Sequence, residues 1–142
     1  MKLHHATTDD GLKGILSTGV IETRWRCTLD DGSVIEAVWL TSSPDGWLRM
    51  TDSVGAKATT HRIEVSLPDD EVTSWAELKK DPLLPSAMAR QYDVTANMHG
   101  KRSDPDSWFV IRRPIPRHEW IQIRRIADDL LVWPEEFPAS RA

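Results

Sequence analysis

The chain has 142 residues, of which 39% are hydrophobic and 28% charged, and its formal net charge is −4. This length suits one folded domain, and the negative net charge excludes a generally basic nucleic-acid coat or a polybasic membrane binder. The single Cys27 cannot form an internal disulfide, and no cysteine and histidine spacing is typical of a zinc site. Without an apolar run near 18 residues or a leader-like start, we expect a soluble, cytoplasmic protein with no membrane partner.

The first third of the chain predicts a strand, a helix and further strands. Residues 7–10 are helix-capping types, and apolar residues follow at helical spacing until Gly19. We therefore expect a short strand over residues 1–5 and a helix over 9–18. An extended segment should follow over 24–29, and the apolar, β-branched run 34–41 predicts a strand.

The rest of the chain predicts short strands separated by turns. Strands are expected over 61–67, 108–112 and 120–126, helical turns over 73–80, 86–92 and 116–119, and a polar loop over 97–106. Residues 47–58 fit either a weak helix or a long loop. The sum is a small, single α+β domain over residues 1–130, with a split, mostly antiparallel β core and few short helices. A Pro-rich C-terminal tail should occupy residues 131–142.

The N-terminal block carries a family resemblance. The segment Leu3-His4-His5-Ala6-Thr7, followed by Gly11-Leu12 and by residues 14–21, resembles the opening of the ADP-ribosyltransferase superfamily. It is most similar to the branch of DNA-targeting ADP-ribosyltransferase toxins and RNA 2′-phosphotransferases. The resemblance covers about the first forty residues and, loosely, 108–123. It implies an ADP-ribosyltransferase-like fold, NAD as substrate or ligand, and a nucleic acid or a protein as the acceptor of ADP-ribose.

His5 and Thr7 are the first candidate site residues. An imidazole at a strand end can hydrogen-bond a ribose hydroxyl, and a following threonine can fix a loop or a phosphate. The resemblance places His5 in the NAD-binding position, with His4 where the family usually has tyrosine. The alternative is that His5 buttresses the neighbouring helix and Thr7 is an ordinary cap.

A second candidate block lies at the end of the 34–41 strand. The resemblance implies that Trp39 stacks on nicotinamide and that the hydroxyl of Thr41 or Ser42 supports the ribose, because a flat ring binds a flat heterocycle through its face. The alternative is that Trp39 is a core residue. Arg62 belongs to a set of arginines that can hold phosphates, as the phosphotransferase branch does.

The C-terminal half lacks an acid that the resemblance implies. Transferases of this superfamily usually hold a ribose hydroxyl with a glutamate, whose position falls here near Ser107, and no glutamate is present there. Asp104 and Asp106 lie close to this position, and Glu119 follows the next turn. Glu119 is our candidate for the catalytic role. The alternative is that Glu119 is an exposed turn carboxylate.

Arginines also gather in the last third of the chain. They suit a phosphate-bearing ligand or a nucleic acid, or else they protect a solvated edge strand. Strict alternation along the last strand places Trp120, Gln122 and Arg124 on one face and Ile121, Ile123 and Arg125 on the other.

Two functions remain open from the sequence. The first is an NAD-binding, ADP-ribosyltransferase-like protein that transfers ADP-ribose to a nucleic acid or protein. The second is a non-catalytic module of the same fold that binds another nucleotide or a protein partner, which the missing glutamate and the short length favour.

Overall fold

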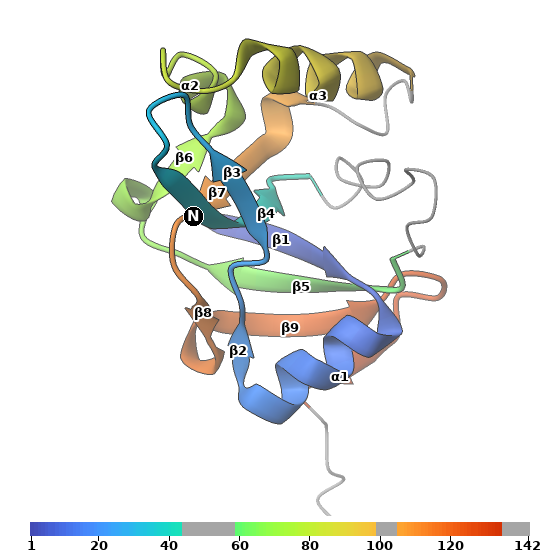
Figure 1. Ribbon diagram of the computed structural model, residues 1–142. Coiled ribbons are helices and arrows are strands. Elements are labelled where there is room, and N and C mark those ends of the chain that lie inside the picture. The colour runs from blue at the N-terminus through green and yellow to red at the C-terminus, as the bar shows by residue number, and fades with distance from the viewer. Residues whose placement is uncertain (44–58, 99–104, 135–142) are drawn as a thin grey trace, which may run out of the picture.

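The computed structural model describes residues 1–43, 59–98 and 105–134 (Figure 1). Segment 47–58, which fitted either helix or loop, lies outside the described residues, as do residues 99–104 of the expected polar loop. The strands are β1 (Lys2–Thr7), β2 (Val20–Ile21), β3 (Trp25–Thr28), β4 (Val34–Thr41), β5 (His61–Ser66), β6 (Val72–Ser74), β7 (Trp108–Ile111), β8 (Ile115–Pro116), β9 (Trp120–Arg125) and β10 (Leu131–Trp133). The helices are α1 (Asp9–Thr18), α2 (Trp75–Leu78) and α3 (Ser86–Met98), with 3-10 turns η1 (Asp69–Glu71), η3 (Pro105–Ser107) and η4 (Arg117–Glu119).

Eight of the strands in the described part of the chain form one curled, antiparallel sheet. Its order is β10-β9-β5-β1-β4-β7-β6, with β3 paired to β4 off this path, while β2 and β8 form a separate two-stranded ladder. Figure 1 shows α1 beside β9 and β2, with α2 and α3 together at the opposite end of the molecule. The protein is therefore a small α+β domain with a mostly antiparallel sheet, as the sequence predicted.

The sheet continues past residue 130, where we expected the tail to begin. Strand β10 pairs with β9, with Leu131 opposite Arg124. The ring of Trp133 meets that of Trp120 edge-on, with centroids 5.3 Å apart. Residues 131–133 thus belong to the folded domain, and the Pro-rich segment from 135 onward lies outside the described residues.

Helix α1 has the bounds that its local signals predicted. The Thr8 hydroxyl accepts a hydrogen bond from the Gly11 N–H at 3.1 Å, which satisfies one free donor at the helix start. Gly19 ends the helix in the left-handed conformation, with φ of 74°, and its N–H donates to the Ile15 carbonyl at 2.8 Å. Leu12 and Ile15 are buried beneath the helix.

Two apolar clusters lie on opposite faces of the sheet, because successive strand side chains point to opposite sides. Val38 and Leu40 of β4 belong to the cluster that includes Leu12 and Ile15 of α1. Ala37 of β4 belongs to the other cluster, together with Trp75 of α2, and Trp39 packs against the edge of that cluster. Along β1, Leu3 shares the face under α1, so His5 and Thr7 share it too.

The predicted alternation along the last strand is wrong at its start. Glu64 of β5 pairs with Gln122, but the next residue, Val65, pairs with Trp120. The extra residue, Ile121, makes a β-bulge, which shifts Trp120 onto the same buried face as Ile123.

Candidate functional site

A pocket of about 280 Å³ lies between strand β1, helix α1 and strand β2. Its lining comes from β1 (His5, Thr7), α1 (Gly11, Gly14, Ile15, Thr18), β2 (Val20, Ile21) and the segment that follows (Glu22, Arg24). The structure therefore brings two of the expected site residues, His5 and Thr7, into one pocket.

One hydrogen bond sets the chemistry of the His5 ring. Its Nδ1 lies 2.9 Å from the Trp39 carbonyl oxygen. A carbonyl only accepts, so Nδ1 carries the proton, and in the neutral ring Nε2 is left as an acceptor. Burial lowers the pKa of His5 from its ordinary value, and the bond to Trp39 opposes this only in part. At neutral pH the imidazole of this lining residue is thus uncharged, and its Nε2 carries the lone pair of an acceptor.

Two glycines shape the wall that α1 gives to the pocket. A Cβ at Gly11 would collide with the Thr7 hydroxyl, so this turn of the helix approaches β1 closely only because Gly11 has no side chain. A Cβ at Gly14 would meet nothing within 4 Å, which shows that this stretch of wall faces open space.

Two charged side chains stand at the rim of the pocket. Glu22 and Arg24 line it, and both residues are exposed. The rim therefore offers a carboxylate and a guanidinium to any ligand that extends out of the pocket. Sequence reasoning missed both residues, because nothing in the short stretch after Ile21 marks them.

The Trp39 ring lies across the sheet from this pocket. It packs among aromatic rings, with centroid distances of 5.1 Å to Trp25, 5.5 Å to Trp75 and 5.9 Å to Tyr92. Only its backbone carbonyl meets His5. The structure thus places the ring in a core cluster, which was the alternative interpretation, and does not bring it to His5.

Thr41 and Ser42 serve the packing of η3 on β4. Thr41 is fully buried, and its hydroxyl lies 3.0 Å from the Ser43 carbonyl oxygen and 3.1 Å from the Ser107 hydroxyl. Ser42 is exposed, and its N–H donates to the Ser107 carbonyl at 2.8 Å. Neither residue lines the His5 pocket.

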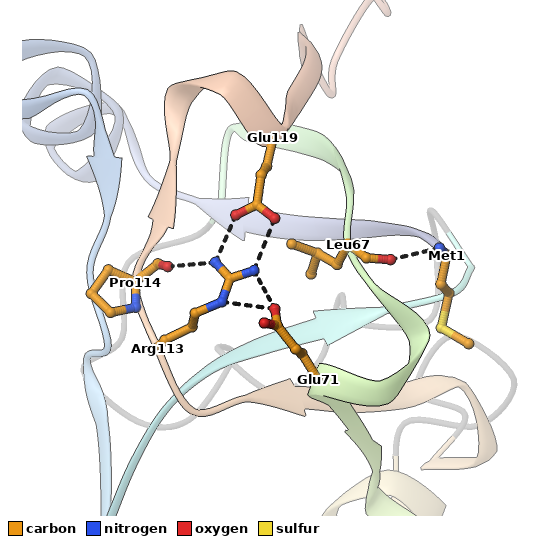
Figure 2. A network of polar contacts seen from close by, with 6 residues as sticks. All are labelled: Met1, Leu67, Glu71, Arg113, Pro114 and Glu119. Carbon is orange, nitrogen blue, oxygen red and sulfur yellow. Dashed lines mark hydrogen bonds and ion pairs between the residues drawn. The ribbon is translucent and has the colours of Figure 1, made fainter.

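Glu119 is held in an ion-pair network (Figure 2). Arg113 donates to both of its carboxylate oxygens, at 2.6 and 2.9 Å, and also to Glu71 and to the Pro114 carbonyl. The Arg113 guanidinium lowers the pKa of Glu119, and the two carboxylates raise the pKa of Arg113. Glu119 does not line the His5 pocket, and both of its carboxylate oxygens are already bound by Arg113.

The remaining candidates are dispersed. Asp104 lies outside the described residues, and Asp106 is in η3. Arg62 pairs with Asp129 and lines a second pocket, described below. The arginines of the last third have separate partners, since Arg117 donates to the Leu16 carbonyl while Arg125 pairs with Asp128.

No protein-family model matches the chain, and comparison with the curated proteins and with the solved structures finds no significant match. Over residues 1–43, 59–98 and 105–134, no group of three or more histidine, cysteine, aspartate or glutamate side chains is placed to hold a metal ion. Within the same ranges, no helix is long and apolar enough to cross a bilayer.

Proposed function

We propose that the protein binds NAD, or a related nucleotide, in the His5 pocket. The observation that carries the proposal is the bond from His5 Nδ1 to the Trp39 carbonyl, which leaves Nε2 as the acceptor of a ring that lines the pocket. A ribose hydroxyl is a donor of the kind that this atom needs. The resemblance of the N-terminal block to ADP-ribosyltransferases supports NAD as the ligand.

The size of the pocket suits part of a dinucleotide. Its volume of about 280 Å³ lies just below the range of roughly 300–1,000 Å³ typical of small-molecule sites. We therefore place one ribose with its base inside, against His5 and the glycine wall of α1. The pyrophosphate then lies over the rim, where the Arg24 guanidinium offers two parallel donors to phosphate oxygens.

ADP-ribosyl transfer is the reaction that the resemblance implies for this site. The C–N bond between the ribose and nicotinamide breaks, so that nicotinamide leaves and positive charge develops on the ribose. A nucleophile of the acceptor then attacks the ribose carbon that carried nicotinamide. A carboxylate near the developing charge lowers the barrier. Glu22 lines the pocket and fits this role, whereas Glu119 is neutralised by Arg113.

The second candidate function is nucleotide binding without catalysis. The observation that favours it is the pairing of Glu119 with Arg113, because Glu119 was the acid expected to be catalytic. A substitution of Glu22 distinguishes the two functions. If the chain is a transferase, Glu22→Gln should lower nicotinamide release from NAD roughly 10²-fold, as removal of one charge-stabilising group does. NAD binding with no nicotinamide release by the native chain would establish the second function.

The binding proposal itself is tested with His5→Asn. The asparagine amide can still donate to the Trp39 carbonyl, because its nitrogen occupies the place of Nδ1, but it offers no acceptor at the place of Nε2. We expect calorimetry to show at least tenfold weaker binding of NAD and ADP-ribose. His4→Ala is the matched control, since His4 points to the opposite face, and its affinity should stay within twofold of native. Equal losses in both variants, or none in His5→Asn, would overturn the proposal.

A further inference from the structure

A second pocket, of about 250 Å³, lies on the other face of the sheet. It is lined by His4, Arg62, Glu64, Gln122, Arg124 and Asp129. These side chains come from β1, β5, β9 and the turn between β9 and β10. Because His4 and His5 are successive residues of β1, this polar pocket is separated from the His5 pocket by the sheet itself.

The strand register arranges the lining in two rows. Arg62 of β5 lies directly opposite Arg124 of β9. In the next row of the same face, His4, Glu64 and Gln122 lie side by side on β1, β5 and β9. Like charges directly opposite each other destabilise a sheet. The facing guanidinium groups therefore need an anion between them.

Asp129 supplies that anion in the structure. Its carboxylate lies 2.5 Å from Arg62 and 3.8 Å from Arg124, whose guanidinium also donates to the Asp129 carbonyl at 2.8 Å. Asp129 holds a φ of 57°, a left-handed conformation that is uncommon outside glycine. Its side chain is 62% exposed, against 22% for Arg62 and 31% for Arg124. Exposed ion pairs are weak, so this carboxylate is a cap that another anion can replace.

The second row can bind hydroxyl groups. The Glu64 carboxylate and the Gln122 amide oxygen are acceptors, and the Gln122 oxygen already receives a bond from Arg124 Nε at 3.1 Å. His4 Nδ1 is buried and has no hydrogen-bond partner within the described part of the chain. A buried polar atom of this kind calls for a water or a ligand. Glu64 also repels a second phosphate, which limits the ligand to one anionic group at the arginine end.

We propose that this pocket binds a small sugar phosphate, with its phosphate on Arg62 and Arg124 in place of the Asp129 carboxylate and its hydroxyls on Glu64 and Gln122. Bidentate guanidinium contacts suit phosphate oxygens. The pocket volume is below that of most drug-sized sites, which suits a single phosphorylated sugar. The proposal goes beyond NAD binding and does not depend on it, because the two pockets share no residue.

The test is an NMR titration of the native chain with ribose 5-phosphate, inorganic phosphate and ribose. We expect ribose 5-phosphate to bind most tightly, with shifts on β5 and β9 at Arg62 and Arg124. Arg124→Gln should weaken binding at least tenfold. Asp129→Asn keeps a residue that tolerates the left-handed conformation but removes the competing charge, so it should strengthen binding at least threefold. Arg125→Gln is the control, because Arg125 follows Arg124 on β9 but pairs with Asp128, and it should bind as the native chain does.

Several outcomes would overturn the proposal. Ribose 5-phosphate that binds no better than inorganic phosphate contradicts the role of Glu64 and Gln122. An unchanged or weaker affinity in Asp129→Asn contradicts the role of Asp129 as a replaceable cap. A 5′-phosphorylated oligonucleotide that shifts the same residues while ribose 5-phosphate does not would make this a nucleic-acid surface. His5→Asn should leave all of these titrations unchanged, which separates a failure here from a failure of the NAD proposal.

Discussion

His5 shows how a backbone group can determine the chemistry of a side chain. The Trp39 carbonyl selects the tautomer, and burial lowers the pKa of the ring, so Nε2 keeps its lone pair at neutral pH. Protonation would remove that acceptor. Because the pKa of His5 is lowered, nucleotide binding through Nε2 should persist as the pH falls through the ordinary histidine pKa of about 6.5 and be lost only in more acidic solution.

The two pocket glycines give a matched test of the wall of α1. Gly11→Ala should lower the free energy of unfolding by roughly 1–2 kcal/mol, because the new methyl must displace the buried Thr7 hydroxyl. Gly14→Ala has open space around its methyl and should raise the free energy of unfolding by about 0.5–1 kcal/mol, the usual gain in a helix interior. Chemical denaturation of both variants measures the difference. Equal effects would show that Gly11 is not needed for the close approach of α1 to β1.

The sequence predicted two of the residues that line the candidate site. His5 and Thr7 could be found because a strand, a capped helix and a glycine surround them in a recognisable order. Glu22 could not, since an exposed acid in a short connection looks like any other surface charge. Glu119 was selected by its residue type and by its position between a turn and a strand. Its pairing with Arg113, six positions earlier, could not be predicted, because it depends on the turn at η4.

At the scale of single elements, local signals predicted α1 well and the later elements less well. Thr8 and Gly19 mark the ends of α1 by capping chemistry that depends only on neighbouring residues. The helix expected over 86–92 extends to Met98. It includes residues 97 and 98, which we had assigned to the start of a polar loop. The bulge at Ile121 depends on the pairing of β9 with β5, so no periodicity within β9 could predict it.

Arg113 joins η1 to η4 by binding Glu71 and Glu119. The contribution of the Glu119 pair to the stability of the fold depends on pH. The folded-state pKa of Glu119 is lowered, so the pair stabilises the fold above the ordinary carboxyl pKa of about 4.5, and this stability is lost as the pH falls through the lower, folded-state pKa. Glu119→Gln should lower the free energy of unfolding by roughly 1 kcal/mol at pH 7, allowing for the partial exposure of Arg113. Its stability should also decline less than that of the native chain as the pH falls from 5 through the lowered pKa of Glu119.

Denaturation curves across that pH range check the prediction. Glu77→Gln is the control, because Glu77 pairs with Lys80 on the surface and both side chains are well exposed. It should change the free energy of unfolding by less than about 0.5 kcal/mol. A native pH profile reproduced by Glu119→Gln would show that this ion pair adds nothing to the fold, and lost NAD binding in the same variant would return Glu119 to the candidate site.

At the scale of the whole molecule, the sheet divides the protein into separate environments. One face carries α1 and the His5 pocket, and the other carries the aromatic cluster and the polar pocket of Arg62 and Arg124. The sequence placed His5 and Trp39 on strands correctly. It could not tell that they face opposite sides, because that depends on the order and register of β1 and β4 in the sheet.

The central claim is that a nucleotide binds at His5 Nε2, on the α1 side of the sheet. The most direct measurement is an NMR titration with NAD that follows the ring nitrogens of His5 and the indole N–H groups together. The account predicts that Nδ1 is protonated before NAD is added, and that Nε2 shifts as it accepts a hydrogen bond while the Trp39 indole stays unchanged. A shift at the Trp39 indole with none at His5 Nε2, or no shift at either group at millimolar NAD, would contradict it.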